Sequence, residues 1–204
     1  MSSTNRSNAR DFHVSDYYKT PVKSILDFLM EFDNDNPELS FTGGGKSILD
    51  PCAGGRDSIG IMHQSMSYPE ALRSFKPLKD LQGITTIDLR NDSLAEIKAD
   101  YLSYECKNKF DVIITNPPFG VALSIIKKAI EDVKDGGLVV MLLRLNFFGS
   151  KERFSFFDKT MPIFAYVHQR RMKFTDTTST DSIEYMHAVW QKENYPKFSK
   201  LRII

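Results

Sequence analysis

The sequence of 204 residues has only two cysteines, Cys52 and Cys106, and no metal-ligand spacing surrounds them. A disulfide scaffold and a zinc site are therefore not expected, and a reducing cytoplasm is the expected compartment. The four histidines show no ligand spacing either, so the sequence predicts no metal site. No apolar run approaches the ~20 residues needed to span a bilayer. The polar first ten residues lack the apolar core of a secretory signal.

Neither sign of charge is in clear excess, because the net charge is +1. No strong overall field therefore points to a nucleic acid or a membrane surface. The composition, 41% hydrophobic and 26% charged, is that of a globular protein. Residues 1–13, rich in Ser, Asn and Arg, are expected to form a disordered tail. Residues 14–204 are then long enough for one α/β domain, in which residues 67–82 resemble an insertion.

Apolar residues recur at helical spacing after Pro21, and short β-branched runs follow at intervals. The predicted strands are 47–49, 84–87, 110–115, 138–143, 163–167 and 184–190. The predicted helices are 21–32, 57–66, 91–98 and 121–133, the last one ending at the glycine pair 136–137. This alternation predicts a parallel, doubly wound sheet, closed by one antiparallel strand, with ligands at the carboxyl ends of the strands.

Two acidic positions follow the first two strands. The first opens the turn Asp50-Pro51-Cys52-Ala53-Gly54-Gly55, whose small residues allow a ligand to approach the backbone. The second is Asp88, where an acid of a nucleoside-binding α/β fold accepts hydrogens from ribose hydroxyls. Taken singly, each is equally typical of an ordinary turn or of a solvated strand end.

The segment Asn116-Pro117-Pro118-Phe119 ends the strand at 110–115. Two prolines explain why a strand stops, but not why asparagine precedes them and an aromatic follows. The amide oxygen and a prolyl carbonyl can accept both hydrogens of an NH₂ group. A phenyl ring can stack on a flat base. The segment therefore predicts a site that binds a planar amine.

In this order the three motifs resemble S-adenosylmethionine-dependent methyltransferases that act on amino groups. More narrowly, they resemble DNA N6-adenine methyltransferases, including small phage- and prophage-encoded enzymes, over residues 16–190. The resemblance implies a Rossmann-like class I methyltransferase fold with a seven-stranded, mostly parallel sheet. It also implies methyl transfer from S-adenosyl-L-methionine to adenine N6 in DNA. The family's usual target-recognition domain has no counterpart here.

The resemblance also implies site residues. The turn 50–55 is similar to the family's methionine-binding loop, Asp88 to its ribose-binding acid and Asp100 to its adenine-side acid. The implied cofactor-binding residues are Tyr18, Thr20, Pro21, Asp50, Pro51, Ala53, Gly54, Asp88, Leu89, Asp100, Tyr101 and Asn116. The implied catalytic residues are Asn116, Pro117, Pro118 and Phe119.

Basic residues gather from Arg144 to Lys173, seven against two acids, a local balance of +5. This stretch is either a phosphate-binding rim or a solvated face, and residues 144–183 are the candidate substrate-binding region. The expected substrate-binding residues are Phe119, Arg144, Arg170, Arg171 and Phe174. Phe174 is equally typical of a core aromatic. Dimerisation would lengthen a short recognition site.

Three alternatives remain open at this point. The first is an RNA methyltransferase acting on adenine N6 or guanine N2 of ribosomal RNA, and the second is a protein glutamine N5-methyltransferase. The third is a subunit with the cofactor fold that only binds nucleic acid or a partner. DNA is the favoured partner, RNA is the next, and no membrane partner is expected.

Overall fold

The computed structural model describes residues 19–40, 45–55, 66–75, 81–174 and 182–204. Its helices are α1 (Val22–Asp35), α2 (Ser67–Phe75), α3 (Ala122–Asp132) and α4 (Lys151–Phe157), with short 3-10 helices at Pro37–Leu39 and Leu145–Phe148. Its strands are β1 (Lys46–Asp50), β2 (Leu81–Asp88), β3 (Ile97–Lys98), β4 (Phe110–Thr115), β5 (Val133–Arg144), β6 (Phe164–Val167), β7 (Tyr185–Gln191) and β8 (Lys200–Ile203).

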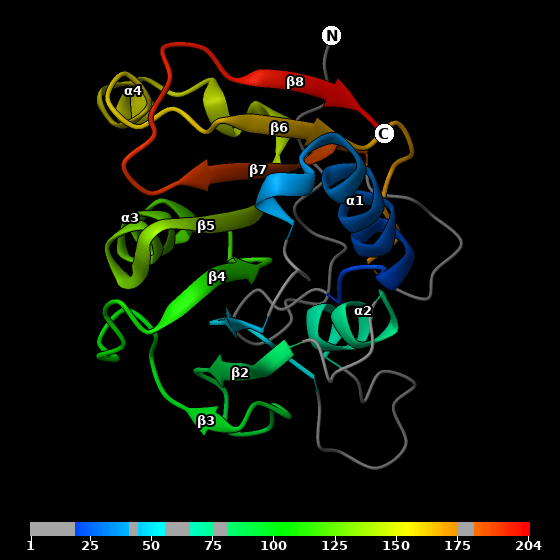
Figure 1. Cartoon of the computed structure of the whole chain (residues 1–204), viewed down its shortest axis with the longest axis vertical. Helices are drawn as coiled ribbons and strands as arrows, with labels where there is room; N and C mark the ends of the chain where they lie inside the picture. Colours follow the sequence, from blue (N-terminus) through cyan, green and yellow to red (C-terminus); the bar gives the residue numbers. More distant parts are fainter. Residues whose placement is uncertain (1–18, 41–44, 56–65, 76–80, 175–181) are drawn as a thin grey trace, which may run out of the picture.

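Within these ranges eight strands form one sheet in the order β3-β2-β1-β4-β5-β7-β6-β8. Figure 1 shows β8 at one edge and β3 at the other. Neighbours from β3 through β5 are parallel, whereas β7 is antiparallel to both β5 and β6. The expected mostly parallel sheet with one antiparallel strand is confirmed. The sheet has eight strands and not the seven that the resemblance implied, and the two strands missing from the predicted set are β3, which pairs with β2, and β8, which pairs parallel with β6.

The central strands are buried on both faces, so they consist of continuous apolar runs. Val112 and Ile114 belong to the core beneath α1 and α2, which lie close together on one side of the sheet (Figure 1). Ile113, between them in sequence, belongs to the core that includes α3. This alternation follows from the two-residue period of a strand.

The chain runs outward from β1 through β2 to β3, and then returns to β4 on the other side of β1. This reversal is the position at which open α/β sheets bind ligands, beyond the carboxyl ends of the strands. The Thr115 hydroxyl at the end of β4 donates a hydrogen bond to Asp50 Oδ1 at the end of β1, over 2.6 Å. The two strand ends that flank the reversal are therefore joined by their side chains.

Helix α1 is attached to the far half of the sheet. Tyr166 of β6 donates a hydrogen bond to Asp35 at the end of α1 and accepts one from Asn36, each over 3.0 Å. Arg202 of β8 forms ion pairs with Glu31 and Asp35. The helix therefore lies over β6 and β7, and the residue that precedes it by two positions, Thr20, has a fixed place relative to the sheet.

The helix expected at 91–98 does not form, and this prediction is wrong. The backbone donors of the segment bond outside it, because Leu94 N–H donates to Gly54 O over 3.1 Å and Glu96 N–H to Thr86 Oγ1 over 2.9 Å. The segment instead forms a turn, and Ile97–Lys98 then pairs with β2 as β3. Tertiary bonds to the turn 50–55 and to β2 outweigh the local helical spacing.

The glycine pair after α3 does not end that helix. Helix α3 ends at Asp132, and Val133 already pairs with Phe110 as the first residue of β5. The next β4–β5 pair is Val112 with Leu138, so residues 134–137 bulge out of the register. A Cβ at Gly137 would lie 2.8 Å from the Asp111 carbonyl oxygen. A side chain there would therefore clash with β4.

Part of the expected insertion, residues 67–75, forms α2. Its Tyr68, Ala71 and Leu72 are buried in the core shared with α1. The predicted tail 1–13, Tyr18 and residues 57–65 of the predicted helix 57–66 lie outside the described residues. No helix in the described part of the chain is long and apolar enough to cross a bilayer.

Candidate active site

A cleft lies beyond the carboxyl ends of β1, β2 and β4, at the reversal of the strand order. It encloses about 790 Å³, a volume that includes open solvent at its mouth. Its lining includes nine residues expected in the site: Thr20, Pro51, Ala53, Asp88, Leu89, Asp100, Tyr101, Asn116 and Pro118. The sequence analysis did not assign the other lining residues: Lys19, Cys52, Ser67, Tyr68, Arg90, Leu102, Val121 and Ile125.

The turn after β1 is fixed against the end of β2. Gly54 and Gly55 both have positive φ, 65° and 78°, a conformation that other residues rarely adopt. Gly54 N–H donates to Asp88 Oδ2 over 2.8 Å. A Cβ at Gly55 would lie 2.9 Å from the Leu94 side chain. The turn therefore needs glycine at these positions, and it brings its backbone close to the Asp88 carboxylate.

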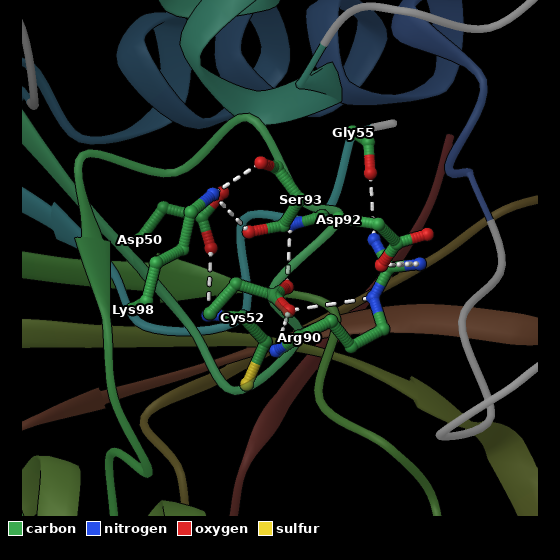
Figure 2. A network of polar contacts seen from close by, with 9 residues as sticks. Asp50, Cys52, Gly55, Arg90, Asp92, Ser93 and Lys98 are labelled. Atoms are coloured by element: carbon green, nitrogen blue, oxygen red, sulfur yellow. Dashed lines mark hydrogen bonds and ion pairs between the residues drawn. The ribbon is translucent and has the colours of Figure 1, made fainter. Parts of the chain in front are cut away.

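A buried ion pair holds Asp88 at the wall of the cleft. Its Oδ1 accepts hydrogen bonds from Arg90 N–H over 2.8 Å and from Arg90 Nε over 3.4 Å. The Arg90 guanidinium also donates to Gly55 O over 2.6 Å (Figure 2). A carboxylate accepts up to about four hydrogen bonds, so Asp88 can accept more from a ligand in the cleft. Arg90 lies two residues after Asp88, but no pattern in the sequence indicated the pairing.

Asp100 and Tyr101 form the wall of the cleft on the β3 side. Asp100 is exposed, and its Oδ1 accepts a hydrogen bond from Leu102 N–H over 3.0 Å, which fixes the carboxylate in a turn. Tyr101 is buried, and Lys128 Nζ lies 5.1 Å from the centre of its ring. This wall offers an acidic acceptor beside apolar side chains.

Asn116 lies at the opposite wall, directly after β4. Its Nδ2 donates to Thr20 Oγ1 over 3.1 Å. In this arrangement the amide nitrogen is the donor and Oδ1 is the acceptor end of the amide. Pro118 also lines the cleft, whereas Pro117 is buried. Asn116, the expected catalytic residue, is thus hydrogen-bonded to Thr20, which lies two residues before α1.

Asp50 lies beneath the cleft and is not among its lining residues. It is 1% exposed, and burial raises the pKa of its carboxyl group to about 7. Oδ1 accepts hydrogen bonds from Thr115 and from Cys52 N–H, the second of which Figure 2 shows. Oδ2 is buried without a hydrogen-bond partner among the described residues. Asp50 therefore supports the turn from below, whereas the sequence analysis expected it to contact a cofactor.

A cluster of four side chains lies around the end of β5. The Arg144 guanidinium carbon is 4.2 Å from the centre of the Phe119 ring. The ring centres of Phe119 and Phe174 lie 6.0 and 4.8 Å from that of Tyr185. Three of the expected substrate-binding residues, Phe119, Arg144 and Phe174, are therefore brought together. They are not among the lining residues of the cleft.

Arg170 and Arg171 lie elsewhere. Both line a second hollow that also contains His168 and, from α1, Asp27 and Glu31. Arg171 forms an ion pair with Glu184 over 3.2 Å. Pro21 lines this hollow rather than the cleft. The basic stretch 144–173 therefore does not form one continuous rim in the structure.

The described residues contain no group of three or more His, Cys, Asp or Glu side chains that could hold a metal ion. The sequence matches no family model, and it matches no curated protein.

Solved structures show which class of fold this is. The chain resembles a Listeria monocytogenes protein assigned as a class I S-adenosylmethionine-dependent methyltransferase, with TM-score 0.65 and 13% identity over 94% of this chain and 67% of that one. It resembles a Pyrococcus horikoshii protein assigned as an RNA methyltransferase, with TM-score 0.56 and 14% identity over 86% and 87% of the two chains. A third is the Bradyrhizobium japonicum N-methyltransferase NodS bound to S-adenosyl-L-homocysteine, with TM-score 0.52 and 10% identity over 86% and 89%. The fold is the Rossmann-like fold of class I methyltransferases.

Proposed function

We propose that this chain transfers a methyl group from S-adenosyl-L-methionine to the exocyclic N6 amine of adenine in DNA. The observation that carries the proposal is the position of Asn116. It ends β4 at the wall of the cleft, and its amide is oriented by Thr20. Neighbours of the same fold include an N-methyltransferase, NodS, which supports amine methylation in general.

The residues of the cleft fit this cofactor. Asp88 offers a carboxylate to a ribose hydroxyl, and the glycine turn 54–55 allows a ligand to lie against the backbone. Asp100 offers an acceptor to an adenine amino group, and Leu89, 62% exposed, offers an apolar surface to the ring. The cofactor, when bound, supplies a methyl group activated by its sulfonium charge.

An exocyclic amine is a weak nucleophile because its lone pair is delocalised into the ring. In this proposal Asn116 Oδ1 and the Pro117 carbonyl oxygen each accept a hydrogen bond from one N–H group of the substrate amine. Acceptors placed there favour the positive charge that develops on the nitrogen during attack. They also hold the nitrogen in line with the methyl group, so part of the barrier is overcome by positioning.

The aromatic cluster supports a flat substrate. A base in a duplex must be flipped out before it can enter such a site. The Arg144 guanidinium covers one face of the Phe119 ring, and a π face accepts either a cation or a base. The flipped base takes the place of this guanidinium over Phe119.

RNA is the second candidate substrate, and one observation favours it. The Pyrococcus horikoshii neighbour, which is similar over most of both chains, is assigned as an RNA methyltransferase. The stacking cluster and the amide acceptor serve an adenine or guanine amine of RNA equally well. The choice between the polymers therefore depends on experiment.

The test is methyl transfer from radiolabelled cofactor to DNA, ribosomal RNA and protein, assayed separately. Label on N6-methyladenine of DNA supports the proposal, and label on RNA alone or on protein alone refutes it. Asn116→Ala should lower the rate by about 10²–10³, by analogy with the loss of one pre-placed polar group. Asn194→Ala, at an exposed asparagine outside residues 144–183, is the matched control. Undiminished transfer by folded Asn116→Ala would refute the role of the amide.

A further inference from the structure

Three buried side chains form a hydrogen-bonded chain through the α1 side of the sheet. Tyr68 of α2 bonds through its hydroxyl to His187 Nε2 of β7, over 3.0 Å. His187 Nδ1 lies 2.8 Å from His168 Nε2, just after β6. Tyr68, His187 and His168 are 3%, 0% and 6% exposed. The sequence analysis gave no role to either histidine.

The chain joins the two hollows of the molecule. At one end Tyr68 lines the cleft together with Thr20, and the two side chains interact. Thr20 in turn accepts the hydrogen bond from Asn116 Nδ2. At the other end His168 lines the second hollow, opposite Asp27 of α1. A continuous row of polar contacts therefore links the proposed catalytic amide to a distant surface.

The protons of this row can point in one consistent direction. Burial lowers the pKa of His168 to about 4 and that of His187 well below its usual value, so both rings are neutral at pH 7. A neutral imidazole has one donor nitrogen and one acceptor nitrogen. If His187 carries its proton on Nδ1, it donates to His168 and its Nε2 accepts from Tyr68. The Tyr68 oxygen can then accept from Thr20, whose own oxygen accepts from Asn116.

The opposite direction would disturb the site. If His187 carried its proton on Nε2, it would donate to Tyr68, and Tyr68 would donate to Thr20. Thr20 would then accept two hydrogen bonds, and its own proton would have no place in the row. That proton would find an acceptor if the Asn116 amide turned its oxygen toward Thr20. Reversal of the row would therefore favour the turned amide, in which Oδ1 no longer faces the cleft.

We propose that Tyr68, His187 and His168 are positioning residues that hold the Asn116 amide with Nδ2 toward Thr20 and Oδ1 toward the substrate amine. This inference rests on the proposed amine methylation. Packing alone does not explain the row. His187 stacks on Phe28, with ring centres 4.3 Å apart, but an apolar ring would pack there without burying three polar groups in line.

The first test does not depend on activity. Nitrogen-15 NMR of the imidazole rings should show His187 protonated at Nδ1 and bare at Nε2 at pH 7. A proton on Nε2 would overturn the inference, whether or not the protein methylates anything. Absence of methyl transfer to every substrate would instead refute the proposed function, while the NMR result would still decide the direction of the row.

The second test uses variants that keep the packing. Tyr68→Phe should lower kcat about tenfold, the change expected for one lost hydrogen bond of ordinary strength. His168→Leu should lower kcat several-fold, and His168→Gln, whose amide oxygen can accept at the position of Nε2, should restore most of it. Tyr104→Phe is the control, because Tyr104 is a half-buried tyrosine packed against the other core of the sheet, away from this row and from α1.

Wild-type kcat in Tyr68→Phe, with only a lower melting temperature, would show that the row is structural and would overturn the proposal. An equal loss of kcat in His168→Leu and His168→Gln would also overturn the proposal, because it would show that a hydrogen-bond acceptor at the position of His168 Nε2 does not affect catalysis. A fall in kcat for Tyr68→Phe, with kcat of Tyr104→Phe unchanged, supports it.

Discussion

Replacement of Asp50 by asparagine should make the protein more stable at alkaline pH and leave it nearly unchanged at acidic pH. Asp50 is 1% exposed, and burial raises its pKa from 3.8 to about 7. The folded protein therefore holds a proton on Asp50 that the unfolded chain releases above pH 3.8. This stabilising contribution is complete below pH 3.8 and is lost as the pH rises through 7.

The size of the effect follows from the shift. One pKa unit corresponds to about 1.4 kcal/mol, so a shift of about three units corresponds to about 4 kcal/mol. Asparagine is neutral throughout and keeps an acceptor for the hydrogen bonds of Thr115 and Cys52. The free energy of unfolding of Asp50→Asn minus that of the wild type should therefore rise by about 4 kcal/mol between pH 4 and pH 8.

Urea unfolding of the two proteins at several pH values, without cofactor, measures this difference. Asp111→Asn is the control: burial alone would raise the pKa of Asp111, but hydrogen bonds from Ser47 and Lys134 outweigh it and lower the pKa. Its contribution is complete above pH 3.8 and fades only below it, so the control difference should stay constant from pH 5 to pH 8. A constant difference for Asp50→Asn as well would refute the assignment of a protonated buried carboxyl.

Three further outcomes follow from the structure. Asp88→Asn should weaken cofactor binding by about 1.5–3 kcal/mol, because it removes a charge-assisted acceptor, and unchanged affinity in calorimetry would exclude Asp88 from the ribose site. Gly137→Ala should destabilise the fold by about 1–3 kcal/mol in urea, since its Cβ would clash with the Asp111 carbonyl, while Gly120→Ala, with nothing within 4 Å, should be neutral. Joint replacement of Arg170 and Arg171 by Glu should lower DNA affinity and its salt dependence if the second hollow contacts phosphates, and unchanged binding in a salt titration would show a solvated face.

The sequence predicted the parallel part of the fold well. Runs such as 110–115 and 138–143 are apolar because both faces of a central strand are buried, and no other element of that length has this pattern. The β3 strand and the β8 strand could not be predicted in this way, because they are short and lie at the sheet edges. Helix α2 was missed because its apolar face is short and lies within the stretch 67–82, which resembles an insertion.

The candidate site was predicted only where its residues follow strands in local motifs. Asp88 and Asn116 end strands, so their convergence follows from the order of the sheet. Tyr68, His187 and His168 have no local signal, because Tyr68 and His187 are separated by 119 residues and meet only when α2 packs on the sheet. Asp50 was assigned to the cofactor because a strand-end acid is typical of that role, whereas the side chain turns inward to Thr115.

The attachment of α1 to the far half of the sheet has a consequence for synthesis of the protein. The partners of Asp35 on β6 and β8 lie 131 and 167 residues further along the chain. During translation α1 leaves the ribosome early and α2 follows it, but the partners of α1 on β6, β7 and β8 emerge much later. Contacts of such long range form late and slow the folding of a domain. A nascent chain interrupted before residue 164 therefore contains every predicted catalytic residue and still lacks the bonds from β6 and β8 that hold α1, the helix that begins two residues after Thr20.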